Sequence, residues 1–393
     1  MVKTERHCIK GTPEIVRLCG LSREIYNRCN FLMRKAWFER RRLPDINELV
    51  KGVESLDCFK NLHNTKTAKQ TVRRTLSDWS DFRKTLAAWG KDPSRFISRP
   101  RPPGYKEKLA QVVFYEETIK RKPRKQGLIV PTNKCFSIAS TRDFKQVVVT
   151  PKRWGFVIEV QYEEEVKDTR YWLDKGKTCC IDIGLNNLAA VTFDQTRPIL
   201  VNGRIVKSIN QWCNKNPSRA RLRKRYWRLE NYFHHASKMI IDACVKRGVG
   251  RIIVGRNKGW KLRLDMGSTN QDFQHVPFAL FLQKLQYKAE AACIQVTYTE
   301  ESWTSKASFY DRDEMPEVLV PETEPVFSGV RKHRGLYVTK DGFALNADVN
   351  ASMNIGRKAI PESLGIGDRS LAARPWTVNP LKAASVKDVV VGL

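Results

Sequence analysis

The sequence predicts an α+β chain of several domains, with helices and a small antiparallel β-barrel or sheet in front and an α/β domain behind. Three patterns support this prediction. Apolar residues recur at helical spacing in two long stretches near the N-terminus, and short strands follow up to residue 162. From about residue 176 onward, apolar strands alternate with helices, which favours a mixed or parallel sheet whose ligands gather at the carboxyl ends of its strands.

Residues 2–8 alternate and predict a strand, and residues 12–42 and 61–90 predict helices. The second helix carries an apolar stripe and an opposite face that is almost entirely cationic. Because its charge is nearly all positive, we favour phosphate contact over plain solvation for that face. The stripe consists of Ala68, Val72, Leu76, Trp79, Phe82, Leu86 and Trp89, and the face of Lys66, Lys69, Arg73, Arg74, Arg83 and Lys84.

The stretch from Arg99 to Gly104 is basic and rich in proline, and it predicts a stiff linker. Five short apolar runs separated by turn residues follow between Leu109 and Tyr162. Together with the N-terminal strand, they predict a small antiparallel barrel or sheet.

In the rear half, residues 217–247 predict one long helix that starts after Asn216. Its first turns are basic with interleaved aromatic residues, a composition typical of a helix that lines a nucleic-acid groove. Two strands, near 251–254 and 294–298, enclose a helix over 278–292. The expected nucleic-acid contacts on the long helix are Arg219, Arg221, Arg223, Lys224, Arg225, Tyr226 and Trp227.

The chain carries 71 Lys and Arg against 41 Asp and Glu, a formal net charge of +30. Such an excess is self-repelling unless a polyanion neutralises it, and nucleic acid is the usual partner. A membrane fits poorly, because no stretch approaches the roughly 18 apolar residues of a spanning helix. The N-terminal residues lack the apolar core of a signal peptide, so we expect the cytoplasm, or the nucleus in a host that has one.

Cysteine usage favours the same compartment. The ten Cys are scattered without C-x-x-C spacing, none follows Cys293, and the six His lack metal-ligand spacing. We therefore expect buried free thiols and no structural zinc.

Two acidic residues far apart in the chain have distinctive settings. Asp182 ends a short apolar strand, and Asp348 lies with Asn350 and Asn354 near the start of a helix rich in small residues. Burying a carboxylate is costly unless it binds a cation. Taken singly, a turn Asp and a helix-capping Asp are simpler interpretations. Taken with the charge of the chain, the pair favours a Mg²⁺ site of the kind used for phosphoryl transfer.

Glu300 and Glu301 follow the end of another predicted strand, so acids from three parts of the chain can converge. These segments and their neighbours resemble the RuvC nuclease domain of TnpB, the transposon-encoded RNA-guided DNA nuclease whose ancestry type V CRISPR effectors share. The resemblance is carried by CIDIGLNNLAAV, RIIVGRNKGWKL, VTYTEESWTSKASF and LNADVNASMNIGRKA. The front half is similar to TnpB's wedge barrel with its inserted recognition helices, so the resemblance spans roughly residues 1–360.

The resemblance implies five regions. They are a wedge β-barrel (1–10 and 105–175), a helical recognition domain (11–104), an RNase H-like α/β RuvC nuclease domain (176–302 and 344–360), an insert in place of a zinc ribbon that loads target nucleic acid (303–343), and a C-terminal tail (361–393).

The chain departs from the TnpB pattern at the second RuvC motif. Gly255 stands where the family's usual Glu follows an apolar strand. Some members of the wider group, including a branch of the eukaryotic Fanzor relatives, have an alternative Glu before a T-S-K segment, and Glu301 fits that E-x-x-T-S-K pattern. Glu300 remains an alternative. Neighbours in a regular strand point to opposite faces, so only one of the two should reach the metal.

The second departure is the missing zinc ribbon. No Cys lies between Ser305 and Asn346, and Ala307 stands where a first Cys would be. This insert must fold without zinc or stay partly mobile. Its acidic run with several prolines predicts an exposed loop, comprising Asp311, Asp313, Glu314, Glu317, Glu322 and Glu324.

The resemblance implies an RNA-guided DNA endonuclease that uses two Mg²⁺ or Mn²⁺ ions held by Asp182, Glu301 and Asp348, with Asn350 supporting Asp348 or capping its helix. Its partners would be a structured, transposon-derived guide RNA and target DNA, bound by one protein monomer, without a membrane. Its location would be the bacterial or archaeal cytoplasm, with the nucleoid. A nuclease-dead RNA-guided repressor, a type V CRISPR effector and a plain RNA-binding accessory protein remain alternatives.

Overall fold

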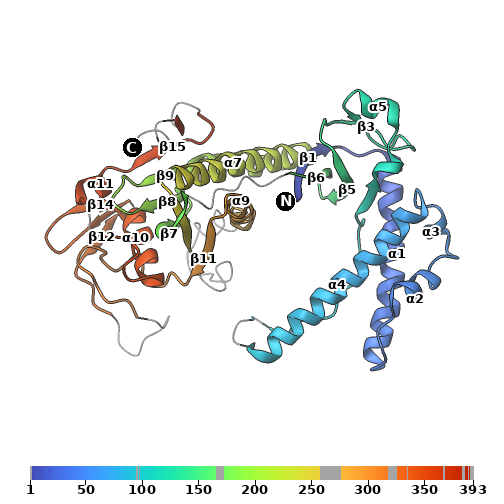
Figure 1. Cartoon of the computed structure of the whole chain (residues 1–393), viewed down its shortest axis with the longest axis horizontal. Coiled ribbons are helices and arrows are strands. Elements are labelled where there is room, and N and C mark those ends of the chain that lie inside the picture. Colours follow the sequence, from blue (N-terminus) through green and yellow to red (C-terminus); the bar gives the residue numbers. More distant parts are fainter. Residues whose placement is uncertain are drawn as a thin grey trace. The chain divides into compact units, whose positions relative to one another are not determined.

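The computed structural model divides into two compact units, Met1–Glu165 and Val166–Leu393, which are coloured from blue to red along the chain in Figure 1. Each unit has its own hydrophobic core. The structure describes residues 2–93, 96, 98–164, 172–256, 276–316, 325–333, 335–365, 368–382, 386–387 and 389.

In unit 1, two long helices pack against each other. Thr12 caps the first helix and Pro13 occupies its first turn, while Asn64 caps the second by accepting a hydrogen bond from the amide of Thr67 at 2.8 Å. The buried indole of Trp79 donates to Asn30 Oδ1 at 2.8 Å, which joins the helices through their core. The helices are α1 (Pro13–Phe38), α2 (Ile46–Lys51), α3 (Asp57–Lys60) and α4 (Thr65–Lys91).

The two faces predicted for α4 are confirmed. Ala68, Val72, Trp79 and Phe82 are buried, and the other three residues of the apolar stripe are half-buried. All six cationic residues of the opposite face are exposed. The short helices α2 and α3 were not predicted.

The sheet of unit 1 is antiparallel, with strand order β1-β6-β5-β2. The N-terminal strand joins it through β6, as predicted. The described strands form an open sheet, not a closed barrel, because β1 and β2 each pair with one neighbour only. The elements are β1 (Val2–Ile9), β2 (Val112–Tyr115), a 3₁₀ turn (Glu116–Thr118), α5 (Arg121–Lys125), β3 (Leu128–Ile129), β4 (Ile138–Ala139), β5 (Phe144–Lys152) and β6 (Gly155–Glu163).

Unit 2 is built on a six-stranded mixed sheet with the order β11-β10-β7-β8-β9-β15. Strands β7, β8 and β9 form an antiparallel meander, whereas β10 and β11 run parallel to β7. The strands are β7 (Asp174–Asp182), β8 (Asn187–Phe193), β9 (Ile199–Asn202), β10 (Val249–Gly255), β11 (Gln295–Thr299) and β15 (Trp376–Val378).

The segment set apart by sequence as a C-terminal tail contributes the last of these strands. Trp376–Val378 pairs in parallel with β9, and the buried Val378 joins the core of unit 2. The short helix α11 (Arg369–Ala373) precedes it. The described residues of this segment from 368 to 378 are therefore part of the fold of unit 2.

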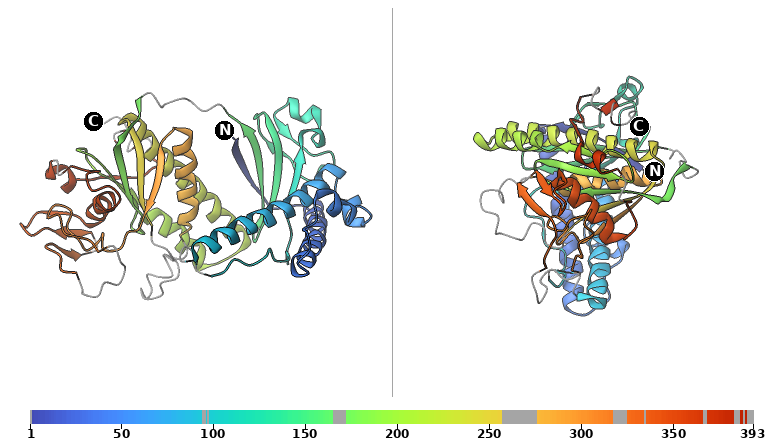
Figure 2. Two further views of the ribbon diagram at one scale, coloured as in Figure 1. Left: turned by 60° about the horizontal axis from the view of Figure 1, so that its bottom comes forward. Right: turned by 90° about the vertical axis from the view of Figure 1, so that its left-hand side faces the viewer.

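Helices cover both faces of this sheet, as Figure 2 shows. Successive strand residues point to opposite faces. Cys179 and Ile181 therefore pack with α7 and α9, whereas Cys180 and Ile253 pack with α10. The helices are α6 (Arg204–Lys215), α7 (Arg219–Lys246), α9 (Phe278–Ala291) and α10 (Ala347–Ala359), of which α6 was not predicted.

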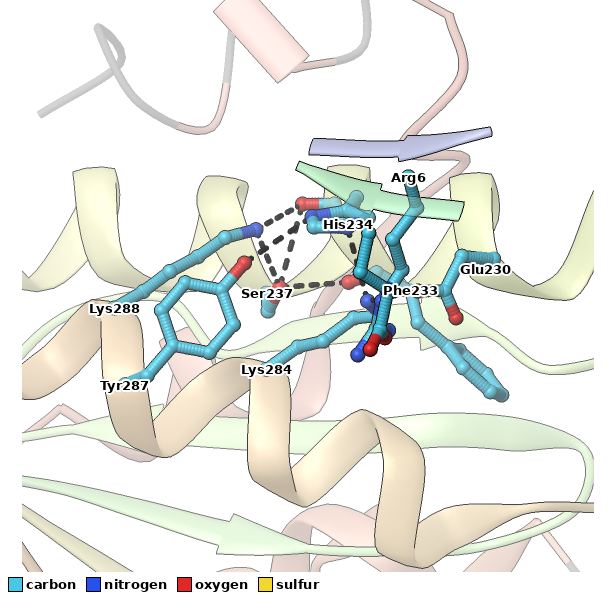
Figure 3. A network of polar contacts seen from close by, with 9 residues as sticks. Arg6, Glu230, Phe233, His234, Ser237, Lys284, Tyr287 and Lys288 are labelled. Atoms are coloured by element: carbon cyan, nitrogen blue, oxygen red, sulfur yellow. Dashed lines mark hydrogen bonds and ion pairs between the residues drawn. The ribbon is translucent and has the colours of Figure 1, made fainter. Parts of the chain in front are cut away.

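A buried polar network joins α7 to α9 (Figure 3). Lys284 Nζ donates to Glu230 Oε1 at 2.8 Å and contacts His234 Nε2 at 2.9 Å, and Lys288 Nζ contacts Ser237 Oγ at 2.8 Å. The Lys284 and Glu230 side chains are only 3% and 9% exposed. Buried charges are tolerated when they are paired and hydrogen-bonded, so this network fixes how the two helices face each other.

Two strands of the insert, β12 (Val330–His333) and β13 (Leu336–Val338), form a small antiparallel sheet with β14 (Ala344–Asn346), which follows directly after the insert. Asp313 was predicted to lie in an exposed loop, but it is buried and accepts hydrogen bonds from the amides of Ser308 and Ser328. The three glutamates of that acidic run from 317 onward lie outside the described residues.

All ten cysteines are free thiols, and eight of them are buried. The predicted thiol state is therefore confirmed. In the part of the chain that the structure describes, no helix has the length and apolar character needed to cross a membrane.

Candidate active site

Asp182 lies at the end of β7, in the interior of the sheet. It pairs with Ala190 of β8, and the preceding Ile181 pairs with Val254 of β10. Burial, together with the charges of Glu301 and Asp348, raises the pKa of the Asp182 carboxyl well above its usual range. The structure therefore brings the three predicted acids within electrostatic reach of one another.

Asp348 sits in the first turn of α10. The cap of this helix is Asn346, whose Oδ1 accepts hydrogen bonds from the amides of Asp348 and Val349 at 2.9 and 3.2 Å. Neither Asp348 nor Asn350 is the cap. The cap leaves the Asp348 carboxylate available for other contacts, and the positive end of the helix dipole favours its charge.

Two side chains that sequence reasoning missed contact this carboxylate. Asn187, at the start of β8, donates to Asp348 Oδ2 at 2.8 Å, and Arg331 of β12 lies 3.2 Å from Oδ1. Arg331 also lowers the pKa of Asp182, in opposition to burial. Asn187 follows Asp182 closely in CIDIGLNNLAAV and could have been suspected, whereas no sequence signal marks Arg331.

Glu300 and Glu301 have different surroundings. Strand β11 ends at Thr299, before both residues. Glu300 turns away to accept hydrogen bonds from the amide of Ser302 at 2.8 Å and from Lys358 Nζ at 2.6 Å. Burial alone would raise the pKa of Glu300, but these bonds hold it below its usual value. Glu301 is instead one of the charges that act on Asp182.

The Glu301 carboxyl occupies a buried position beside β10. Burial, with the charge of Glu300 as a smaller contribution, raises its pKa to about 7. A β-carbon added to Gly255 would lie 2.9 Å from Glu301 Oε2 and 2.5 Å from Ile355 Cδ1. Glu301 thus fills the space that a side chain at position 255 would enter.

We call Asp182, Glu301 and Asp348 the acidic triad. Carboxylate oxygens are the ligands that Mg²⁺ and Mn²⁺ prefer, so the donor set fits a divalent metal. The burial of the Asp182 carboxyl beside two other acids fits a cation in the same place. Across the described ranges, however, no three acidic, His or Cys side chains are already grouped closely enough to hold an ion. Asn187 and Arg331 hold Asp348 in its present position.

Helix α10 is fixed to the loop after Glu301 by two asparagines one turn apart. Asn350 Nδ2 donates to the carbonyl of Ala307 at 2.8 Å and its Oδ1 accepts from the amide of Phe309 at 3.0 Å. Asn354 Nδ2 donates to the carbonyls of Thr304 and Ala307. Asn350 therefore supports the site through the T-S-K loop. It was expected to hold Asp348 or to cap the helix, and its hydrogen bonds serve neither role.

The small residues of α10 allow it to approach the sheet closely. Ser352 Oγ donates to the carbonyl of Cys180 at 2.8 Å. A β-carbon on Gly356 would lie 2.4 Å from Cys180 Sγ, so no larger residue fits there. This close approach brings Asp348 to the end of β7.

A cavity of about 440 Å³ lies beside Asp348. Four of its nine lining residues are asparagines and one, Arg204, is cationic. The lining residues are Asn186, Asn187, Leu200, Asn202, Arg204, Gly335, Asn346, Asp348 and Thr377.

The predicted nucleic-acid contacts fall on both units. Arg73, Arg74, Arg83 and Lys84 are exposed on α4 of unit 1. On α7, the exposed members of the predicted set are Arg219, Lys224 and Trp227, and the half-buried ones are Arg221, Arg223, Arg225 and Tyr226.

Comparison with known proteins gives one family match. Residues 278–355 match the family described as Cas12f1-like, TNB domain. This stretch begins at α9 and contains Glu301, the insert sheet and most of α10 with Asp348. The match confirms the predicted resemblance to TnpB/Cas12f-like RNA-guided nucleases. No curated protein matches the chain.

Solved structures also resemble the chain. A Cas12f1 from a Cas12f1–sgRNA–target DNA complex is 13% identical, with a TM-score of 0.36 over 92% of this chain and 100% of that one. A CRISPR-Cas12f ternary complex gives 12% identity and 0.35, over 87% and 80%. Alicyclobacillus acidoterrestris C2c1 with single-guide RNA gives 13% and 0.25, over 87% of this chain and 31% of that one.

Proposed function

We propose that the protein is an RNA-guided DNA endonuclease that hydrolyses phosphodiester bonds at the acidic triad. The observation that carries this proposal is that Glu301 and Asp348, which come from separate parts of the chain, both act electrostatically on the carboxyl of Asp182. A structural role would not require such an arrangement, because buried like charges raise one another's pKa and destabilise the fold.

The architecture supports the RNase H-like RuvC arrangement that the resemblance implies. A mixed sheet with helices on both faces presents Asp182 at the carboxyl end of β7. The loop after the parallel strand β11 supplies Glu301 at the same edge. Ligands of such sheets collect at this edge.

Asp182, Glu301 and Asp348 would hold two Mg²⁺ or Mn²⁺ ions. When bound, such ions supply an activated water and stabilise the leaving 3′-oxygen. Asn187 orients the Asp348 carboxylate through Oδ2. Glu301 Oε2 is shielded from water, and Asp182 is half-buried at the end of β7. Arg331 neutralises part of the charge of Asp348 by its ion pair with that carboxylate.

The basic faces of α4 and α7 would bind guide RNA and target DNA through the phosphate backbone, while base pairing supplies the sequence specificity. We propose that unit 1 recognises a short DNA motif that flanks the target. The lining of a cavity of about 380 Å³ there includes four glutamines, two cations and one glutamate, Glu159, among apolar and hydroxyl residues. A Gln amide pairs bidentately with adenine, and cations contact phosphates. The residues are Gln70, Gln111, Gln146, Gln161, Arg74 and Lys106.

One observation favours a second candidate, a nuclease-dead RNA-guided DNA-binding protein. Gly255 has no carboxylate, and the described acidic residues are not grouped into a ready metal site. The buried charge of Glu301 opposes this candidate, because a dead site has no reason to retain it.

The test starts from the native complex. The chain is expressed with the DNA that flanks its gene, the co-purified RNA is sequenced, and a plasmid library matching its guide segment is supplied with randomised flanking bases. Asp182→Ala, Glu301→Ala and Asp348→Ala should each abolish cleavage and leave target binding nearly intact. Glu300→Ala is the matched control and should cut.

The outcomes separate the candidates. Binding without cleavage by the unaltered chain in Mg²⁺ and in Mn²⁺ would establish the nuclease-dead protein. Cleavage by the Glu300→Ala/Glu301→Ala double variant would refute the role of Glu301. In the same library, enrichment of adenine-containing flanks that is lost in Gln146→Ala would support the glutamine cavity as the motif reader.

A further inference from the structure

Three cationic side chains gather around one ring, that of Trp212 on α6. The charged ends of Arg221, Lys224 and Arg228, all on α7, lie 5.3, 5.9 and 4.9 Å from the centre of the Trp212 ring. These distances are within the range of cation–π attraction. Neither Trp212 nor Arg228 was among the predicted nucleic-acid contacts.

The spacing explains why one ring serves three cations. Residues three, four and seven apart on a helix share a face, and positions 221, 224 and 228 follow this rule. The two helices are also tied by hydrogen bonds beside the ring. Arg221 Nη1 lies 3.4 Å from the carbonyl of Trp212, and Arg225 Nε donates to Asn210 Oδ1 at 2.7 Å. Trp212 is therefore held against this face.

The cluster has a large excess of positive charge. In the described part of the chain, no carboxylate forms an ion pair with Arg221, Lys224 or Arg228. The ring quadrupole holds the cations together but cannot neutralise them. Lys224 and Arg228 are exposed, so an external anion can reach them. An arginine stacked on a ring still presents its N–H groups at the guanidinium edge.

We propose that Trp212 positions Arg221, Lys224 and Arg228 as a single array that binds the phosphate backbone of a nucleic acid. This inference rests on the proposed nucleic-acid partners and adds a specific site on unit 2. Trp212 is a positioning residue, because it acts through the three cations.

The dimensions favour a nucleic acid strand over a single anion. Each cation lies within 5.9 Å of the ring centre, so any two charged ends are at most about 12 Å apart. Successive phosphates advance about 3.4 Å along each strand of a duplex, so the array spans at most about three nucleotide steps. A strand can thus offer one phosphate to each cation.

The test is a double-mutant cycle on the full chain, with binding measured in chelator so that no cleavage occurs. The probe is a fluorescein-labelled RNA–DNA hybrid of about 20 base pairs. Trp212→Leu should weaken binding about fivefold. The triple variant Arg221→Ala/Lys224→Ala/Arg228→Ala should lower the slope of log affinity against log salt by about 2.7, for three phosphate contacts.

The coupling decides the proposal. In the triple-variant background, Trp212→Leu should have no further effect, since nothing remains for the ring to position. Trp227→Leu is the matched control. Trp227 lies on α7 with the three cations and is 57% exposed, and the effect of its substitution on binding should be the same in the triple variant as in the unaltered chain. An undiminished effect of Trp212→Leu in the triple variant, or none in the unaltered chain, would overturn the proposal.

Two further arms complete the design. Trp212→Phe keeps an aromatic ring and should bind close to the unaltered chain, and a loss as large as that of Trp212→Leu would contradict the positioning role of the ring. If Trp212→Leu fails to fold, the salt slope of the triple variant still tests the array. The cycle is then repeated with RNA and DNA duplexes of the same length. The coupling between Trp212 and the three cations should be largest for the kind of nucleic acid that the array naturally binds. If the nuclease proposal fails, the chain will bind the target without cleaving it. The double-mutant cycle can still be interpreted in that case, because it measures binding alone.

Discussion

A side chain at Gly255 and the carboxylate of Glu301 cannot occupy the same space, because the β-carbon of any residue at 255 would come within 2.9 Å of Glu301 Oε2. The resemblance places a catalytic Glu on this strand in related nucleases. Here the strand ends in Gly, and a Glu from the loop after β11 fills the adjacent volume. A glutamate at position 255 and the glutamate at position 301 would therefore place their side chains in the same volume.

The first prediction follows from this exclusion. Gly255→Ala should displace Glu301 and Ile355 and lower the cleavage rate about a hundredfold, since a shift of about 1 Å has that effect on a positioned catalytic group. It should also destabilise the fold by about 1–3 kcal/mol through overpacking. Cleavage kinetics and thermal unfolding measure the two effects.

A swap provides its control. Gly255→Glu combined with Glu301→Ala should cut faster than Glu301→Ala alone, because the new carboxylate enters the vacated volume. A double variant no better than the single one would mean that the two positions do not share a function.

The second prediction concerns pH in the absence of metal. The pKa of Glu301 is about 7 when folded, against a usual value of 4.5. The folded chain therefore keeps a proton that the unfolded chain releases, and stability should fall as pH rises from about 4.5 to about 7, by about 3 kcal/mol. Chemical denaturation in chelator measures this. Glu301→Gln should remove the part of the fall that Glu301 contributes, whereas the raised pKa of Asp182 should leave a further fall in place.

Glu300→Gln is the matched control for this measurement. The folded pKa of Glu300 is lowered, so its contribution to stability is present at neutral pH and is lost as pH falls. The Glu300 variant should leave the decline toward neutral pH in place. Saturating Mg²⁺ should flatten that decline, because it holds the carboxylates in their ionised form.

The third prediction concerns Arg331, which lies on the Asp348 carboxylate and offsets the acidic charge around Asp182. Arg331→Met removes a cation that competes with Mg²⁺. Affinity for Mn²⁺, measured by its paramagnetic resonance signal, should rise about threefold. Lys332→Met, one residue along the same strand and exposed, should leave the affinity unchanged. A weaker affinity in Arg331→Met would show that Arg331 helps to assemble the site.

The fourth prediction concerns metal identity. Elemental analysis should find no stoichiometric zinc, since no Cys follows Cys293 and no ligand spacing for zinc occurs. Cleavage should need Mg²⁺ or Mn²⁺ and disappear with a chelator. About one tightly bound zinc per chain would contradict the first part, and chelator-resistant cleavage would contradict the second.

The fifth prediction concerns the guide. A net charge of +30 exceeds what a nuclease fold alone requires. The purified protein should therefore carry a long structured RNA transcribed beside its gene, and its removal should lower the thermal midpoint by mass action. Sequencing of the co-purified nucleic acid decides the matter, and random host RNA would count against the prediction.

The sequence was most informative where one local pattern dominates. The apolar stripe of α4, the strand before Asp182 and the strand before Gly255 are continuous and periodic, so burial fixes both their type and their facing side. Helix α6 and strands β9 and β15 were not predicted. They are short, and β15 is a strand only because it pairs with β9, which lies far from it in sequence.

The sequence alone determined which acids are candidates, because Asp182, Glu301 and Asp348 stand in local settings that can be read residue by residue. It left the alternative of Glu300 open, since two adjacent residues in a loop have no periodicity to orient them. Only the tertiary structure turned Glu300 toward Lys358 and Glu301 toward Asp182. It also brought in Asn187 and Arg331, which contact Asp348, and Trp212, whose ring meets three cations of the next helix. Each of these contacts joins separate elements, and no local pattern encodes how separate elements pack.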